Sequence, residues 1–175
     1  QQSSVAFFPV YPLTMNLVAP FVGSNLAAGV LVSNVYLLCG LIFLYRLTDH
    51  IFKDSGTATR AVFYIAAFPT AFFFSAVYTE STFLLFSTAT AYFARKQQWA
   101  WAAVTGILCS ASRIVGFLIA GIVIYEWLMA HGWTLATIHK RQTWLNLVQG
   151  IRKDWSQLLI IALIPLGMVS YMLFL

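Results

Sequence analysis

The sequence predicts an all-α protein, a bundle of helices that crosses a membrane several times. Of its 175 residues, 61% are hydrophobic and only 9% are charged, and the mean hydropathy is +0.81. Soluble domains carry about 25% charged residues, so this composition lacks the polar surface that a water-soluble globule or a disordered segment needs. The first 45 residues contain no Asp, Glu, Lys or Arg. We therefore expect an integral, multi-pass membrane protein.

Six apolar segments, bounded by polar or charged residues, are candidate membrane spans. A straight span needs about 20 residues. The third and fourth segments are shorter than that, so we expect thinned, tilted or incomplete helices there. Glycines within the segments favour close packing, since small residues let helices approach in lipid. The segments are residues 26–45, 61–77, 82–94, 99–111, 114–129 and 158–175. The glycines are Gly29, Gly40, Gly106, Gly116 and Gly121.

The basic residues are distributed unevenly between the two sides that these spans define. With alternating spans, nine of the ten Lys and Arg residues fall on one side, which the positive-inside rule assigns to the cytoplasm. Residues 1–25, 78–81 and 112–113 then face the outside or the lumen. Topology and lipid phosphate account for the net charge of +5, so no nucleic-acid partner is expected. The nine residues are Arg46, Lys53, Arg60, Arg95, Lys96, Lys140, Arg141, Arg152 and Lys153.

The one long polar loop, at roughly 131–157, contains apolar residues at helical spacing with basic residues among them. This pattern predicts an amphipathic helix on the cytoplasmic leaflet, and the alternative is a surface connector that shields the bundle. No repeat or linker divides the chain, so residues 1–175 are expected to be part of one transmembrane domain. Residue 1 is Gln and the last apolar stretch has no polar flank, so we expect that the N- and C-terminal parts of the full protein are missing. The apolar residues of the loop are Trp144, Val148, Ile151 and Trp155.

Cys39 and Cys109 both lie inside apolar runs, where cysteines usually behave as small buried hydrophobes. A disulfide between them is not expected, and no Cys/His cluster indicates a metal site. No Asp-x-Asp pair or phosphate-binding glycine loop is present, so neither a nucleotide-sugar pocket nor a cofactor is indicated.

On the predicted outer side, residues 7–12 (Phe-Phe-Pro-Val-Tyr-Pro) combine aromatic side chains with two prolines. Proline lacks an N–H and clashes with the preceding turn, so Pro9 and Pro12 are not expected inside a regular helix. An apolar segment without helical structure must be buried in protein or line a cavity, because lipid cannot satisfy a bare backbone. The alternative is a proline-bounded start of a helix.

Glu80 and Arg113 are the only charged residues predicted on that side. Upstream of Glu80, Pro69 is expected to interrupt its helix. A charged group at a membrane face needs a partner or a wet site. We expect Arg113 to pair with Glu80 or with a lipid phosphate, for which its planar fork is suited. The alternatives are a hydrated or helix-N-terminal Glu80, with Thr79 as the cap, and an Arg113 that snorkels at a helix end.

Together these segments place a carboxylate, a guanidinium and a Pro/Tyr-rich stretch on one membrane face, among aromatic rings that can stack on sugars or cover an isoprenoid chain. The combination suits a pocket for a phosphate-linked lipid. It suits an ion channel or a proton-coupled transporter less well, since the spans hold few ionisable groups. Two rivals remain: a transporter or flippase for lipid-linked substrates, and a non-catalytic membrane scaffold in which Glu80 and Arg113 simply pair.

Several segments in this order resemble the PIG-V family of membrane mannosyltransferases, which includes GPI mannosyltransferase 2 and bacterial relatives. The proline, Glu and Arg segments are fairly specific in combination, and the apolar spans between them are not. The segments are Phe7-Phe8-Pro9-Val10-Tyr11-Pro12, Ser33-Asn34-Val35, Leu44-Tyr45-Arg46-Leu47, Phe68-Pro69, Phe72-Phe73-Phe74-Ser75, Tyr78-Thr79-Glu80-Ser81, Ser110-Ala111-Ser112-Arg113 with Gly116, and Ile164-Pro165-Leu166-Gly167 with Tyr171.

The resemblance implies a GT-C type fold in the bacterial plasma membrane or the endoplasmic reticulum membrane, with its active site on the extracytoplasmic or luminal face. It implies a polyprenyl- or dolichyl-phosphate sugar donor, usually of mannose, and an inverting transfer to a glycolipid or glycan acceptor. In similar enzymes an acidic residue in the first outer loop is the catalytic base. That residue would lie upstream of Gln1, so the base is unassigned here.

In that mechanism Arg113 is the candidate that stabilises the leaving phosphate. Glu80 has three candidate roles, which are to hold sugar hydroxyls, to orient Arg113 or to act in proton transfer. Tyr11 and Tyr78 are candidates to contact the sugar or the lipid phosphate. No metal is implied. The other residues expected at the donor site are Thr79, Ser81, Ser112, Phe8, Pro9 and Pro12.

Overall fold

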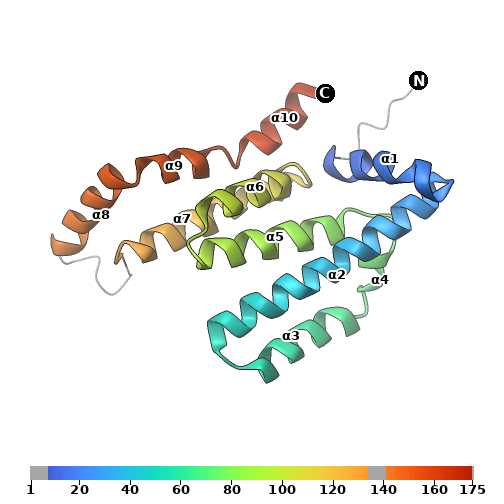
Figure 1. Ribbon diagram of the computed structural model, residues 1–175, viewed down its shortest axis with the longest axis horizontal. Coiled ribbons are helices and arrows are strands. Elements are labelled where there is room, and N and C mark those ends of the chain that lie inside the picture. Colours follow the sequence, from blue (N-terminus) through green and yellow to red (C-terminus); the bar gives the residue numbers. More distant parts are fainter. Residues whose placement is uncertain (1–7, 134–140, 175) are drawn as a thin grey trace.

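The computed structural model describes residues 8–133 and 141–174, and all regular secondary structure in these two ranges is helical. The all-α prediction is therefore confirmed. The elements, labelled in Figure 1 apart from the 3-10 helix η1, are α1 (Val10–Val22), α2 (Asn25–Phe52), α3 (Ser55–Ala67), α4 (Phe72–Ser75), α5 (Glu80–Arg95), α6 (Trp99–Ser110), η1 (Ile114–Leu118), α7 (Ile119–Ala130), α8 (Arg141–Lys153), α9 (Trp155–Ala162) and α10 (Leu166–Phe174).

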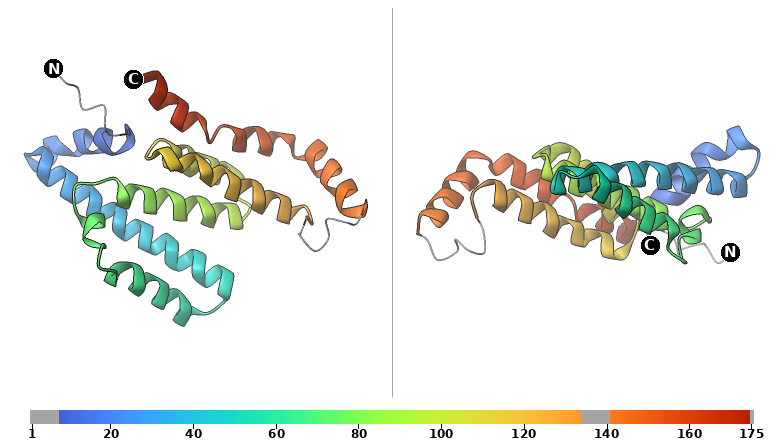
Figure 2. Two further views of the ribbon diagram at one scale, coloured as in Figure 1. Left: turned by 180° about the vertical axis from the view of Figure 1, so that it is seen from behind. Right: turned by 90° about the horizontal axis from the view of Figure 1, so that it is seen from below.

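The long helices run back and forth between two ends of the molecule (Figure 1). Across it, α3, α2, α5, the α6–α7 pair and α9 follow one another, and each contacts the next. α2 and α5 run in the same direction, with the α3–α4 segment returning between them in sequence. This is the alternation that the sequence predicts. One end of the molecule carries α1, the start of α5 and the corner after α6, and the other carries the turns after α2, α5 and α7 (Figure 2).

Local chemistry explains where the helices begin and end. The hydroxyl of Ser24 accepts a hydrogen bond from the backbone N–H of Ala27 at 3.2 Å and so caps α2. Asp54 caps α3 in the same way, accepting from the N–H groups of Gly56 and Thr57, each at 3.0 Å. α3 ends where Phe68 turns to an extended conformation (ψ 140°), because the ring of the following Pro69 excludes a helical one. The predicted interruption at Pro69 is thus confirmed.

The prediction that residues 7–12 are non-helical is wrong for residues 10–12, which begin α1. Phe8 and Pro9 precede the helix, and Phe7 lies outside the described residues. Pro9 occupies the N-cap position of α1, and Pro12 lies in its first turn. The N–H groups of a first turn have no partner within the helix, so proline costs little there. The alternative, a proline-bounded helix start, is therefore correct.

The segment predicted as a sixth continuous span, residues 158–175, is divided between α9 and α10. A turn at residues 163–165 separates the two helices, and Leu175 lies outside the described residues. Pro165 has no N–H to continue the ladder of α9, which accounts for the break. The sequence prediction did not include this interruption.

Small residues allow the tightest helix contacts, as predicted for four of the five glycines. A Cβ on Gly40 of α2 would lie 3.1 Å from the backbone nitrogen of Leu85 in α5. Gly106 packs against Ile164 in the same manner. The prediction is wrong for Gly121, which has no atom within 4 Å of an added Cβ. Gly29 packs against Val77 and Met15, and Gly116 against the backbone of Cys109 and Ser110.

The buried core lies between α5, α6, α7 and α9, and Gly106 of α6 lets Ile164 pack closely against that helix. Cys109 belongs to this core, as predicted, whereas Cys39 is only half-buried. The fully buried core residues include Ala102, Val123 and Ile161.

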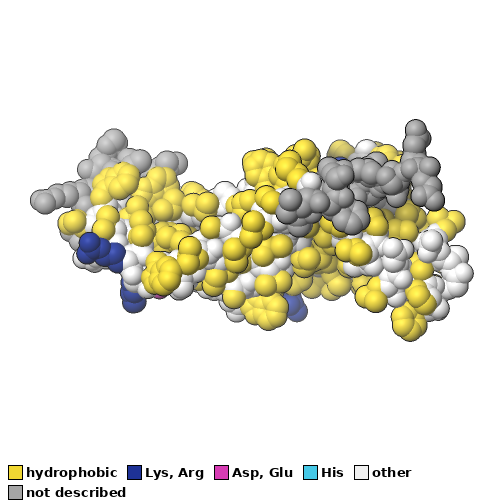
Figure 3. Space-filling view, turned by 90° about the horizontal axis from the view of Figure 1, so that it is seen from above, with side chains coloured by type: hydrophobic (Ala, Val, Ile, Leu, Met, Phe, Trp, Pro, Cys, Tyr) yellow, Lys and Arg dark blue, Asp and Glu magenta, His cyan; other side chains and the backbone are white. Residues whose placement is uncertain are grey.

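Much of the outer surface is apolar, and in the face shown in Figure 3 hydrophobic side chains cover most of the area. Phe21 at the end of α1 is 87% exposed and Leu26 at the start of α2 is 70% exposed. Soluble monomers rarely expose large contiguous apolar patches, and such patches mark contact with lipid or with another protein. Among the described residues, only α2 is long and apolar enough by length and composition to cross a membrane, and the other apolar helices are shorter. The number of spans therefore stays a prediction.

Candidate functional site

The structure brings together the two charged residues that the sequence singles out. Arg113 Nη2 lies 3.3 Å from Glu80 Oε1, although the residues belong to different segments of the chain. Their side chains are 40% and 27% exposed, so the pair lies at the edge of the fold rather than inside it. Of the partners that the sequence left open for Arg113, the structure shows the Glu80 carboxylate.

Glu80 is held at the first residue of α5. The positive end of the helix dipole favours a carboxylate at this position. Thr79 precedes it at the N-cap position, as expected, but its side chain makes no capping hydrogen bond. The favourable interaction at the start of α5 therefore comes from the charge of Glu80 and not from a side-chain cap by Thr79.

Arg113 is held at the corner between α6 and η1, where its backbone is extended (φ −154°, ψ 152°). The chain then turns sharply, and the N–H of Gly116 donates to the carbonyl of Arg113 at 2.8 Å. The guanidinium carbon lies 5.9 Å from the centre of the Phe83 ring, one helical turn beyond Glu80 on α5. One face of α5 thus presents both a carboxylate and an aromatic ring to the guanidinium.

Three polar side-chain atoms in the first turn of α5 are buried and have no hydrogen-bond partner among the described residues. They are Glu80 Oε2, Ser81 Oγ and Thr82 Oγ1. Buried polar atoms are nearly always hydrogen-bonded in folded proteins, and the exceptions mark places where water or a polar ligand satisfies them. The sequence prediction names Ser81 but misses Thr82, although both belong to the polar run that precedes the apolar part of α5.

Tyr11 is buried, and its hydroxyl is hydrogen-bonded within the protein. Its side chain is 3% exposed, its hydroxyl donates to the carbonyl of Gly29 at 3.0 Å, and its oxygen lies 2.7 Å from Ser33 Oγ. These contacts tie α1 to α2. In this structure the Tyr11 hydroxyl is engaged within the protein and is not directed at a ligand.

Ser112 has a similar structural role. It is buried, and its hydroxyl donates to the carbonyl of Cys109 at 2.7 Å, which closes the last turn of α6. The neighbouring Ser110 accepts a hydrogen bond from the backbone N–H of Met168 at 3.0 Å and so attaches α10 to α6. Both serines shape the corner that carries Arg113.

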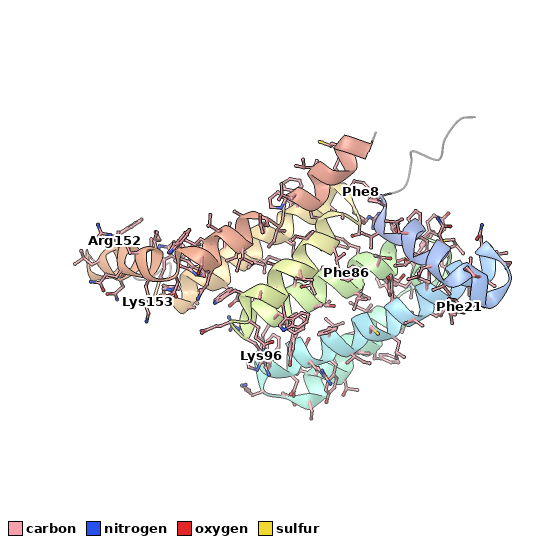
Figure 4. All side chains as sticks on the ribbon, turned by 45° about the horizontal axis from the view of Figure 1, so that its top comes forward. Phe8, Phe21, Phe86, Lys96, Arg152 and Lys153 are labelled. Carbon is pink, nitrogen blue, oxygen red and sulfur yellow. The ribbon has the colours of Figure 1, made fainter. Side chains whose placement is uncertain are left out.

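The remaining predicted residues lie at the same end of the molecule as the ion pair. Tyr78 is 47% exposed, and its ring packs edge-on against Phe73 with centroids 5.5 Å apart. Phe8, Pro9 and Pro12 are half-buried at the start of α1. Figure 4 labels Phe8 at this end and Lys96, Arg152 and Lys153 toward the other.

Besides the local contact of Arg60 with Asp54, two side-chain contacts join separate segments at the opposite, basic end, and the sequence prediction misses both. Arg95 of α5 lies 2.9 Å from Glu126 of α7. His131 Nε2 lies 3.2 Å from Asp154, and the His131 ring stacks on Trp127. Spacing along the chain gives no signal for either contact, because each joins segments that only the fold brings together.

Comparison of the chain with protein-family models, with curated proteins and with solved structures finds no match in any of the three. The chemistry of the site therefore has to be inferred from the side chains that form it. A guanidinium recognises phosphate through paired, charge-assisted hydrogen bonds. The Glu80 carboxylate beside it can accept hydrogen bonds at the edge of the fold, whereas the hydroxyls of Ser81 and Thr82 are fully buried.

Proposed function

We propose that this chain is part of a polytopic membrane glycosyltransferase of the PIG-V type, with a GT-C-like fold. It moves a sugar, usually mannose, from a polyprenyl- or dolichyl-phosphate donor to a lipid-linked or glycan acceptor on the extracytoplasmic or luminal face, with inversion. The observation that carries the proposal is the contact between Glu80 and Arg113 at the end of the molecule opposite the basic turns. Since basic turns mark the cytoplasmic side, this end faces outward.

The reaction requires a group that stabilises the leaving phosphate. An acceptor hydroxyl attacks the anomeric carbon, the bond from that carbon to the phosphate oxygen breaks, and the polyprenyl phosphate departs with an added negative charge. Arg113 is our candidate to take up that charge, and its contacts with Glu80 and Phe83, which favour one orientation of the guanidinium, support this role. No described residue is assigned as the base that removes the acceptor proton.

Of the three roles that the sequence leaves open for Glu80, the geometry supports the orientation of Arg113, because Glu80 Oε1 contacts its guanidinium. Glu80 Oε2 is buried and has no partner among the described residues. A contact of Glu80 with a sugar hydroxyl and a role in proton transfer stay parts of the proposal. The exposed ring of Tyr78 offers a surface on which a sugar can stack.

The membrane part of the proposal is supported by α2 and by the exposed apolar side chains of the other helices. Interrupted helices recur at membrane depth in proteins where they line a site. The breaks at residues 76–79 and 111–113 lie next to the helix start and the corner that carry Glu80 and Arg113. The same breaks also account for the short length of these apolar helices.

The direct test is sugar transfer from polyprenyl-phosphate-mannose by the full-length protein in membranes. We expect Arg113→Ala to lower the transfer rate by about 100- to 1,000-fold, the usual cost of losing one preorganised donor to a developing anion. We expect a smaller loss for Glu80→Gln, because the amide still accepts hydrogen bonds but no longer holds the guanidinium by charge.

The control is the matched ion pair at the basic end. Arg95 and Glu126 are about as buried as Arg113 and Glu80, so Arg95→Ala and Glu126→Gln test for a general loss of stability. Both control variants should transfer normally once folding is verified. The site assignment is wrong if folded Arg113→Ala and Glu80→Gln proteins also transfer at the normal rate. A transporter would instead move the lipid across the membrane without transfer, and a scaffold would do neither.

A further inference from the structure

In helix α8 the larger apolar side chains face away from the protein, whereas an amphipathic helix of a soluble protein buries them against the core. Its protein-facing side carries the buried residues Thr143 and Gly150, with Leu147 between them partly buried against the core. A Cβ added to Gly150 would overlap the ring of His131, so the helix lies directly against the end of α7. The larger apolar stripe does not cover the bundle, which disfavours the interpretation of this segment as a connector that shields it.

The apolar stripe of α8 faces away from the protein. Trp144, Val148 and Ile151 recur at helical spacing on one face and are 49%, 50% and 42% exposed. Trp155, just beyond the helix, is 60% exposed and continues the stripe by sequence spacing. A helix that exposes Trp, Val and Ile along one outer face favours an apolar environment outside the chain.

The basic residues of α8 indicate which apolar environment lies outside the helix. α8 contains three basic residues and no acidic one, and Arg152 and Lys153 are both exposed. Asp154, which follows the helix, is occupied on the protein side by His131 at 3.2 Å and by Gln157 at 3.1 Å. Figure 4 shows Arg152 and Lys153 at the same end as Lys96. The outer side of α8 is therefore apolar and cationic together, which fits anionic lipid rather than a neutral protein groove.

We propose that α8 docks on an anionic lipid surface. Trp144, Val148 and Ile151 enter the boundary between head groups and acyl chains, and Arg152 and Lys153 contact lipid phosphates. The contacts of His131 with Gly150 and Asp154 hold the helix at the end of the bundle, where it lies beside the head groups. This proposal does not depend on glycosyl transfer, so either can fail without the other.

The test is hydrogen exchange of residues 141–153 in the full-length protein, placed in nanodiscs of phosphatidylcholine alone or mixed with phosphatidylglycerol. We expect slower exchange in the anionic discs. The double variant Arg152→Gln/Lys153→Gln should reduce that gain by up to about 30-fold, since each basic residue near an anionic surface contributes about fivefold. High salt should reduce it as well, by screening.

Two controls make the result decisive. Lys53→Gln removes a basic residue from the same end of the molecule but from the turn after α2, so it should leave α8 exchange unchanged. Val148→Ala should speed exchange in both lipid mixtures, because it removes apolar contact rather than charge. Equal α8 exchange in the two lipid mixtures would overturn the proposal. So would protection that depends on protein concentration, which would show a second copy on this face.

Discussion

The ion pair between Glu80 and Arg113 illustrates what single side chains contribute in this protein. Both groups are partly exposed, and pairs of this kind add about 1 kcal/mol or less to folding in water. Their value lies in geometry, since a guanidinium held by a carboxylate and an aromatic ring keeps one orientation. In the same helical turn, Ser81 Oγ and Thr82 Oγ1 are buried without hydrogen-bond partners among the described residues, which lowers the free energy of unfolding. Polar groups that do not stabilise the fold are concentrated here.

Gly116 is the single residue whose lack of a side chain matters most for the corner that carries Arg113. A Cβ there would overlap the carbonyl of Cys109 and lie 2.9 Å from the Cα of Ser110, and backbone cannot move aside as a side-chain tip can. We expect Gly116→Ala to destabilise the protein by about 1–3 kcal/mol or more. The measurement is thermal unfolding of the purified protein in detergent.

Gly121→Ala is the matched control, because nothing lies within 4 Å of its added Cβ in the first turn of α7, which continues η1. Alanine suits a helix interior better than glycine, so this variant should be more stable by about 0.5–1 kcal/mol. Equal stability losses in the two variants would mean that the corner is not closely packed.

At the scale of elements, helix starts are fixed by capping groups that are local in sequence. Asp54 is the clearest example, because its carboxylate accepts from the side chain and backbone of Thr57 and from the backbone of Gly56. The hydroxyl of Thr57, and then the backbone N–H groups of Thr57 and Gly56, donate hydrogen bonds to the Asp54 carboxylate. These hydrogen bonds lower the pKa of the carboxyl below its ordinary value of 3.8, and the charge of Arg60 lowers it further. The charged form is therefore favoured by folding.

The lowered pKa of Asp54 gives a pH dependence of defined sign. A carboxyl whose pKa is lower in the folded state stabilises the protein above its unfolded pKa, and this contribution disappears as the pH falls through the folded value. The thermal stability of the wild type should exceed that of Asp54→Asn by a constant margin from about pH 7 to pH 5 and lose the margin below about pH 3.9. Asp49→Asn, in the last turns of α2, should not remove this pH-dependent component. A margin that persists in acid would contradict the assignment.

The whole molecule is a row of helices whose turns gather at two ends of opposite character (Figure 1). Arg95 and Glu126 pair at one end, and Arg113 and Glu80 at the other. The positive-inside rule assigns the basic end to the cytoplasm. In the topology that we propose, the candidate site then lies on the other side of the membrane.

This sidedness predicts which positions a membrane-impermeant thiol reagent reaches. Asn25 and Ser55 are both exposed at the first residue of a helix, but at opposite ends of α2. With Cys39 and Cys109 replaced by Ala, Asn25→Cys should label in sealed cells or microsomes oriented with the outer or luminal face accessible. Ser55→Cys should label only after permeabilisation. Labelling of both positions from the same side would contradict a spanning α2.

The local features follow from the sequence because their causes are local. Composition predicts helices and an apolar surface, Pro69 predicts a break, and charge spacing predicts the alternation of the turns. Helical spacing of Trp144, Val148 and Ile151 predicts α8. Proline rules alone mispredict the start of α1, since the cost of a proline depends on whether its N–H was needed.

The site depends on contacts between segments that are far apart in the chain, and only the tertiary structure decides those. The sequence singles out Glu80 and Arg113 because charges are scarce on that side, but it leaves open a lipid phosphate, solvent or each other as partners. The packing of Gly116 on α6 and the position of α5 beside it bring the two groups within 3.3 Å. The same packing engages Tyr11 and Ser112 within the protein and leaves Thr82 without a partner among the described residues. Side-chain chemistry is set by the residue, whereas its partner is set by which backbones approach closely.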